Sequence, residues 1–161
     1  MKILSGEEER NAIRFLIEAR TSALESTCER SCCGSIIVSD KEIIGRGFNS
    51  PPRNLEGQRR CSCSKDSYHR KVTDKTCCVH AEQRAMIDAL IKNSQRISGS
   101  RLYFVRLDSN GAPKRSGEPY CTICSKMALD VGIGEFVLWQ EKGICVYGTE
   151  EYNELSFAYR E

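Results

Sequence analysis

The sequence predicts an α/β fold in which a mixed sheet carries helices on both faces. Three observations lead to this prediction. Segments with strand and helix patterns alternate from residue 80 onward. The composition, with 40% hydrophobic and 29% charged residues, is that of an ordinary globular protein. A length of 161 residues fits one domain with a sizeable core. We therefore expect residues 1–161 to form a single domain.

The first half of the chain contains a predicted helix followed by a predicted hairpin. Apolar residues recur at three- and four-residue spacing from residue 6 to about residue 24, and acidic residues fill the first turn, as in an amphipathic helix. Residues 35–38 and 42–48 have strand patterns, and the turn-forming residues 39–41 join them. These two strands should pair as a hairpin.

A long irregular segment separates the hairpin from the remaining elements. Residues 49–79 contain Pro, Gly, Ser and Cys and show no periodicity, and loops of this length in a compact domain are usually functional. The elements expected after it are a helix from 80 to about 92, a strand over 101–107, a helix from 121 to about 131, a strand over 135–139, a short strand over 144–147 and a helix over 150–159.

Charge and hydropathy restrict the location and the partners of the protein. The apolar runs are far too short to cross a bilayer, and residues 1–9 show no hydrophobic secretion segment, so we expect a cytoplasmic protein without membrane contact. The net charge is only +2, but residues 51–79 hold seven basic against three acidic residues, a local +4. Such a patch suits a phosphate-bearing partner, although a solvated loop with incidental charge explains it equally well.

Two short motifs carry the predicted chemistry. His80 and Glu82 begin one predicted helix, and Cys121 and Cys124 begin the next. At a spacing of three residues in a helix both sulfurs face the same way, and the positive helix end favours their thiolate form. One imidazole and two thiolates leave the fourth position of a zinc ion open, as in catalytic sites. A free Glu82 beside that position can move protons for the water that the metal activates.

These residues resemble the signature of the zinc-dependent cytidine and deoxycytidylate deaminases, in which H/C-x-E is followed by P-C-x-x-C. The likeness is greatest to the deoxycytidylate deaminases, because residues 47–51 are similar to their G-x-N-x-x-P segment and a Cys-containing loop leads into a V-H-A-E segment. The resemblance covers roughly residues 35–139. It implies a three-layer α/β/α sandwich with a mixed sheet of about five strands.

The resemblance also implies roles for individual residues. His80, Cys121 and Cys124 would bind Zn²⁺, and Glu82 would shuttle protons. Asn49 would bind the sugar or the base of the substrate, and Ala81 would also contribute to substrate binding. The sequence departs from the family pattern at Tyr120, which separates Pro119 from Cys121. This departure puts the identity of the substrate in doubt more than the metal.

Three functions remain open at this stage. The first is hydrolytic deamination of a cytosine nucleotide, dCMP to dUMP with release of ammonia, or of a free nucleoside. The second is deamination of a base in RNA or DNA, as in tRNA editing, with Tyr68 and Tyr120 available for stacking. The third is a non-catalytic zinc protein. Relatives form dimers to hexamers, so we expect a homo-oligomer.

The remaining cysteines suggest a further metal site. Ten cysteines in a cytoplasmic chain indicate metal ligands or buried thiols before disulfides. Cys61, Cys63, His69, Cys77 and Cys78 are the candidates for a second, structural zinc that fixes the long loop, and unligated reduced thiols are the alternative. Cys121 and Cys124 could also be half of a closed four-thiolate knuckle, but that arrangement leaves His80 and Glu82 unexplained. Cys28, Cys32 and Cys33 are expected to be small buried hydrophobic residues.

Overall fold

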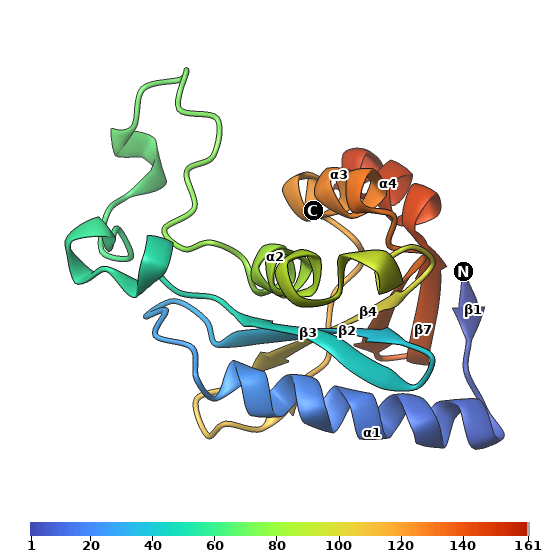
Figure 1. The fold of residues 1–161 in the computed structure, drawn as a ribbon. Coiled ribbons are helices and arrows are strands. Elements are labelled where there is room, and N and C mark those ends of the chain that lie inside the picture. Colours follow the sequence, from blue (N-terminus) through green and yellow to red (C-terminus); the bar gives the residue numbers. More distant parts are fainter. Residues whose placement is uncertain (161) are drawn as a thin grey trace.

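Helices cover both faces of a central sheet, as the alternation of elements predicts. The computed structural model describes residues 1–160. Helix α1 (Gly6–Ala23) lies on one face of the sheet, and α2 (Ala81–Asn93), α3 (Thr122–Val131) and α4 (Thr149–Ala158) lie on the other (Figure 1). The predicted three-layer α/β/α sandwich is confirmed, and each of the four predicted helices is present.

The sheet is mixed and contains seven strands in the order β1-β7-β6-β4-β2-β3, with β5 paired to β4. Only β4 and β6 are parallel, joined by the crossover through α3, whereas the other pairs are antiparallel. The strands beyond the five predicted ones, β1 and β5, are two residues long, too short to show a sequence period. The bounds are β1 (Lys2–Ile3), β2 (Cys33–Ser39), β3 (Glu42–Phe48), β4 (Arg101–Leu107), β5 (Pro113–Lys114), β6 (Glu135–Gln140) and β7 (Gly143–Gly148).

Strands β2 and β3 form the predicted hairpin. Asp40 and Lys41 at its turn have φ of 50° and 66°. Positive φ at both central residues defines the turn that matches the twist of a two-residue hairpin. The pairing places Ile37 opposite Gly45 and Val38 opposite Ile43, with a register shift between them.

Successive side chains along the strands pack into two separate hydrophobic cores, one on each face of the sheet. Toward α1, buried Ile36 and Val105 pack with Leu16 and other residues of that helix. Toward α2 and α3, buried Ile37 and Leu102 pack with Met86 and its neighbours. Neighbours in sequence on one strand thus point to opposite layers, as the two-residue period of a strand requires.

Helix α2 lies very close to β3, and this contact positions the start of the helix. A side-chain carbon added at Gly47 would lie 2.3 Å from the backbone oxygen of Ala81 and 2.4 Å from the nitrogen of Ala85. At Gly45 the corresponding distance to the oxygen of Ala85 is 2.4 Å. Only glycine permits this approach of two backbones.

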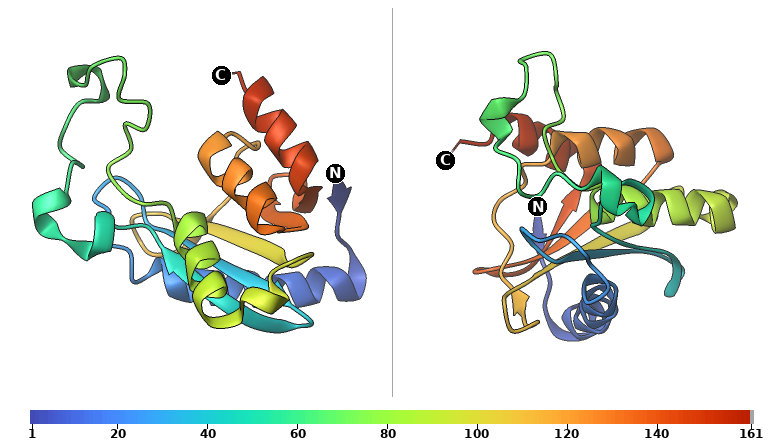
Figure 2. Two further views of the ribbon diagram at one scale, coloured as in Figure 1. Left: turned by 45° about the horizontal axis from the view of Figure 1, so that its top comes forward. Right: turned by 90° about the vertical axis from the view of Figure 1, so that its left-hand side faces the viewer.

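The long segment between β3 and α2 projects from the body of the molecule and returns into the first turn of α2 (Figures 1 and 2). It is irregular, as expected, apart from three single turns of 3₁₀ helix, η1 (Pro52–Asn54), η2 (Glu56–Gln58) and η3 (Lys65–Ser67). Among the helices of residues 1–160, none combines the length and the apolar character that a bilayer span requires.

Candidate active site and metal centre

The first turns of α2 and α3 bring the two sequence motifs together. His80 is the residue that precedes α2, and Cys121 is the residue that precedes α3. The Nδ1 atom of His80 lies 3.3 Å from the Sγ of Cys121 and 3.2 Å from the Sγ of Cys124. All three atoms lie within 4.8 Å of one another. Three side chains of the kinds that zinc prefers therefore meet at two helix N-termini.

Local capping fixes the orientation of His80 and of Cys121. The backbone N–H of His80 donates to the Oε1 of Gln83 at 3.1 Å, and the backbone oxygen of Cys121 accepts from the N–H of Ser125 at 3.0 Å. Cys124 is fully buried in the first turn of α3. The three side chains thus come from the most rigid part of each helix end, where backbone hydrogen bonds hold the chain.

The protonation of this cluster favours a divalent cation. Contacts with Cys124 and with His80 lower the pKa of Cys121 to about 4. The Cys121 thiolate in turn raises the pKa of His80 to about 9, and the same sulfur raises the pKa of Cys124 well above its ordinary value. A metal ion that binds such ligands releases their protons, so this cluster favours a divalent cation.

Glu82 is the second residue of α2 and is buried, with 7% of its surface exposed. Burial raises the pKa of its carboxyl group, and the Cys121 thiolate adds to the rise. A carboxylate with raised pKa is a stronger base than an exposed one, which suits it to proton transfer near neutral pH.

A small cavity of about 80 Å³ opens beside this cluster. His80, Ala81 and Glu82 contribute to its wall from α2, and Asn49 contributes from the end of β3. The structure therefore brings every residue of the predicted catalytic, metal and substrate sets to one place, with only Cys124 behind the cavity wall. The full lining is Ser31, Cys33, Asn49, His80, Ala81, Glu82, Phe104, Arg106, Tyr120 and Cys121.

Asn49 lines the cavity and also forms hydrogen bonds that fix neighbouring residues of its lining. Its Oδ1 accepts from the Oγ of Ser26 at 2.6 Å and from the N–H of Cys33 at 2.8 Å, and its Nδ2 donates to the backbone oxygen of Ser31 at 2.8 Å. An amide Nδ2 carries two hydrogens. Asn49 therefore keeps one donor for a substrate while its other groups fix residues 26–33.

Sequence reasoning did not single out Phe104, Arg106 or Cys33 as cavity residues. Arg106 stands directly opposite Cys33 in the β2–β4 pairing. Phe104 and Arg106 alternate with buried residues of β4, so the strand period assigns them to one face. That face could be identified as the catalytic side only once the order of the strands was known.

A second cluster of thiols lies at the base of the long loop. The sulfurs of Cys28, Cys61 and Cys78 lie within 4.8 Å of one another. Cys77 joins them, with its Sγ 2.7 Å from that of Cys61 and 3.6 Å from that of Cys78. Burial opposes ionisation of Cys61, but hydrogen bonds from Cys77 and from surrounding groups bring its pKa down to about 7. Four thiols at this spacing match the ligand set of a structural zinc site.

The membership of this cluster differs from the predicted second site. Cys61, Cys77 and Cys78 are brought together as expected, but Cys63 and His69 lie outside this cluster. Cys28 stands in their place. Cys28 was expected to be a small buried hydrophobic residue, and the chain between it and Cys61 gives no sign that they meet. In the described structure all ten cysteines are free of disulfides.

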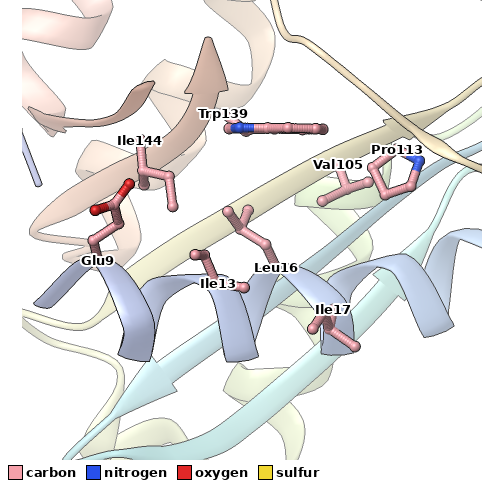
Figure 3. A pocket seen from close by; sticks show the side chains of 8 residues that line it. All are labelled: Glu9, Ile13, Leu16, Ile17, Val105, Pro113, Trp139 and Ile144. Atoms are coloured by element: carbon pink, nitrogen blue, oxygen red, sulfur yellow. The ribbon is translucent and has the colours of Figure 1, made fainter. Parts of the chain in front are cut away.

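A larger apolar cavity of about 250 Å³ lies on the opposite side of the sheet, between α1 and the strands (Figure 3). Ile13, Leu16 and Ile17 of α1 face Trp139 and Val105 across it (Figure 3). Glu9 is the single ionisable residue of its lining. A site for hydrolysis needs acid, base or metal groups, so the catalytic site is the smaller cavity at α2 and α3.

The family model described as the cytidine and deoxycytidylate deaminase zinc-binding region matches residues 8–140. The chain belongs to this family of zinc-dependent hydrolytic deaminases. The match includes both motifs of the candidate site and extends over all elements from α1 to β6.

Similar proteins agree with this assignment. A deoxycytidylate deaminase of Mycobacterium phage D29 is 29% identical over 133 residues, covering 79% of this chain and 92% of the phage protein. A deoxycytidylate deaminase of Schizosaccharomyces pombe is 26% identical, but the 129 aligned residues cover only 35% of its length against 76% of this chain.

Two solved structures share the fold. The dCMP deaminase of cyanophage S-TIM5, in complex with dCMP and dUMP, has a TM-score of 0.55 at 24% identity and covers 83% of this chain and 82% of that protein. The cytidine deaminase of Burkholderia pseudomallei has a TM-score of 0.57 at 14% identity, covering 87% and 94%. The likeness supports the three-layer arrangement described above.

Proposed function

We propose that this protein hydrolyses dCMP to dUMP and ammonia. The observation that carries the proposal is the meeting of His80, Cys121 and Cys124 within 4.8 Å, at a cavity that also contains buried Glu82. The choice of a deoxycytidine nucleotide is supported by the relatives from phage D29 and S. pombe, both named deoxycytidylate deaminases. It is supported also by the cyanophage protein solved with dCMP and dUMP.

Zinc is the metal that fits the three ligands of this centre. An imidazole and two thiolates form a donor set that suits zinc, and two thiolates balance its charge. A bound zinc ion supplies a Lewis acid that lowers the pKa of water from ~15.7 toward ~7. The cluster fits such an ion because its three ligand atoms lie within 4.8 Å of one another and both sulfurs are buried.

Glu82 performs the proton transfers of the reaction. Water adds to C4 of the cytosine ring, and Glu82 takes its proton and delivers it to N3. Glu82 then takes the second proton of the added water and passes it to the exocyclic nitrogen. The bond between C4 and that nitrogen breaks, and ammonia leaves. Burial of Glu82 raises the pKa of its carboxyl group, which keeps it a competent base and acid at the same position.

Asn49 and Ala81 place the substrate in the cavity. The remaining N–H of Asn49 is directed by three hydrogen bonds to protein groups, so it offers a fixed donor to the sugar or base. Ala81 is fully buried at the first residue of α2, where a side chain larger than a methyl group would fill the cavity.

The test of this proposal is the Glu82→Gln variant. The amide keeps the shape of the side chain but cannot accept and return a proton, so ammonia release from dCMP should fall by about 10³-fold or more. Zinc content measured on the same sample should match the wild type. Unchanged turnover would refute the role of Glu82, and absence of ammonia release by the wild type from any cytosine nucleotide would refute the function.

Contacts in the structure favour a nucleotide over a base in a nucleic acid. The positive residues of the long loop are partly paired, with Arg59 bound to Glu56 at 2.6 Å and near Glu29 at 3.6 Å. Tyr120, considered for base stacking, instead packs on Tyr159 with 5.8 Å between ring centroids. Tight, salt-sensitive binding of tRNA or single strands would favour the alternative.

For the second cluster we propose a structural zinc bound by Cys28, Cys61, Cys77 and Cys78. Four sulfurs close the coordination shell and leave no position for a substrate. The ion would tie residues 61–78 to the segment before β2 and so order the loop that leads into α2. Metal analysis should then give two zinc ions per chain.

The wider properties of the protein belong to the same proposal. Reduced thiols throughout the described residues suit a cytoplasmic location, and residues 1–161 would act as one deaminase domain. Exposed apolar residues on α2, among them Ile91 with 78% of its surface exposed and Ile87 with 44%, support self-association. Light scattering of the purified protein would measure the number of subunits.

A further inference from the structure

Arg106 lies at the end of β4 on the face of the sheet that carries α2 and α3. It shares this face with Leu102 and Phe104 because side chains two residues apart point the same way. Two small cavities, of about 80 and 50 Å³, adjoin it. Glu82 and Cys121 line both cavities as well. The guanidinium therefore faces the same enclosed space as the catalytic carboxylate.

The guanidinium of Arg106 lies beside Tyr120 and Cys33, and part of its hydrogen-bonding capacity is unused. Its Nη2 donates to the Oη of Tyr120 at 3.2 Å, and its Nε is buried without any hydrogen-bond partner. Within residues 1–160, no carboxylate oxygen lies within 4.0 Å of its guanidinium nitrogens. An arginine is always charged, and a partly buried charge without a counter-charge destabilises a protein. An arginine placed in this way can accept an anionic ligand.

Arg115 lines only the 50 Å³ cavity, and its guanidinium has other partners. Its guanidinium carbon lies 3.8 Å from the centre of the Trp139 ring, and its Nη1 donates to the backbone oxygen of Gln140 at 3.2 Å. The aromatic face and the carbonyl together occupy it. Of the two arginines, Arg106 is the one that lines both cavities.

Tyr120 connects Arg106 to the metal centre. It is the extra residue between Pro119 and Cys121, and it lines both cavities. Half of its surface is exposed, and its ring packs on Tyr159. A bound nucleotide needs more room than either cavity offers, since small-molecule sites span ~300 Å³ or more. Movement of the Tyr120 side chain would join the two cavities and free the Nη2 of Arg106 from its hydrogen bond.

We infer that Arg106, held by Tyr120, binds the phosphate of the nucleotide substrate and so makes the enzyme selective for nucleotides over free nucleosides. This inference rests on the proposed deaminase function and adds a specificity residue to it. A guanidinium presents parallel N–H donors that match two phosphate oxygens, and the dianion supplies the counter-charge that Arg106 lacks. No other residue of the 80 Å³ cavity is a permanent cation.

The test compares dCMP with deoxycytidine as substrates of the wild type and of Arg106→Gln. We expect kcat/KM for dCMP to fall by about ten- to hundredfold, the effect of removing a hydrogen bond to a charged group, while kcat/KM for deoxycytidine stays within about threefold. Arg106→Lys, which keeps the charge but loses the planar fork, should lie between the two. Arg101→Gln, on the same strand but outside both cavities, is the matched control and should retain the wild-type ratio.

A binding measurement without turnover completes the test. The dissociation constant of dUMP should rise in Arg106→Gln by the same factor, and that of deoxyuridine should not change. Melting temperature and zinc content establish that each variant is folded. If Arg106→Gln does not fold, the comparison is made with Arg106→Lys instead. Equal losses for dCMP and deoxycytidine, or an unchanged ratio, would overturn the inference. A wild type that deaminates no cytosine compound would instead refute the proposed function, and dUMP binding would still test Arg106.

Discussion

The contact between α2 and β3 predicts that Gly47→Ala impairs catalysis although Gly47 does not touch the substrate. The added carbon would lie 2.3 Å from the oxygen of Ala81, whereas ordinary contacts begin at 3.4 Å. Relieving the contact therefore requires a displacement of about 1 Å. Either α2 retreats with Glu82, or the edge strand β3 retreats with Asn49 at its end. Both movements disturb the cavity.

The size of the effect follows from this displacement. A misplacement of ~1 Å in a catalytic group costs on the order of 100-fold in rate, so kcat/KM for dCMP should fall by about that factor. Overpacking should also lower the free energy of unfolding by ~1–3 kcal/mol. For a chain of this length that corresponds to a melting temperature lower by several degrees.

Gly34→Ala provides a matched control on the opposite face of the sheet. Its added carbon would lie 2.3 Å from the oxygen of Ala19 and 2.3 Å from the nitrogen of Ala23, both in α1. The steric conflict is equal, but β2 is held between β4 and β3, so the displacement falls on α1, which carries no residue of the catalytic cavity. Both variants should lose similar stability, and only Gly47→Ala should lose most of its turnover at a temperature where both are folded. Equal activity losses, or full activity of Gly47→Ala, would refute the reasoning.

Further predictions concern the metal ions and pH. Dialysis against a chelator should abolish ammonia release from dCMP, and added Zn²⁺ should restore it; turnover that persists without metal would contradict the assignment. Cys61→Ser should reduce bound zinc from two ions to one and lower the melting temperature while most turnover remains; an unchanged zinc content would exclude the second site. In the metal-free protein, the pKa of Cys121 is lowered from 9.0 to about 4, so its stabilisation is complete above pH 9.0 and declines as the pH falls toward 4. The pKa of His80 is raised from 6.5 to about 9, so its stabilisation is complete below pH 6.5 and is lost as the pH rises through 9. Between pH 6.5 and 9 the two pH dependences cancel. The metal-free wild type should therefore lose stability relative to metal-free Cys121→Ser only as the pH falls from 6.5 to 4. Melting temperatures of the two proteins that change in parallel with pH would argue against this ion pair.

Local patterns in the sequence predicted the elements of the fold well. Helix α1 was predictable because apolar residues recur in each of its turns, and its buried face includes Ala12, Leu16 and Ala19. The end of α3 depends on Gly132, whose φ of 87° suits glycine. The hairpin turn at Asp40 and Lys41 is likewise a local feature. Each of these signals lies within a few residues of the structure that it specifies.

Long-range contacts escaped prediction because no local pattern encodes them. Cys28 meets Cys61 and Cys78 across the loop, and neither their spacing nor their neighbours indicates which thiols converge. Arg106 ends a strand, where an arginine usually reaches water, and its position beside Glu82 follows from the place of β4 between β2 and β6. The pairing of the two catalytic motifs was predictable because the order and spacing of the motifs resemble a known family.

X-ray absorption at the zinc edge of a Cys61→Ser/Cys77→Ser variant tests the central claim most directly, since this variant retains only the metal centre at α2 and α3. The coordination shell should contain one imidazole nitrogen, two sulfurs and one light atom that exchanges with solvent. A shell of four sulfurs, or a folded variant that binds no zinc, would contradict an open catalytic metal held by His80, Cys121 and Cys124.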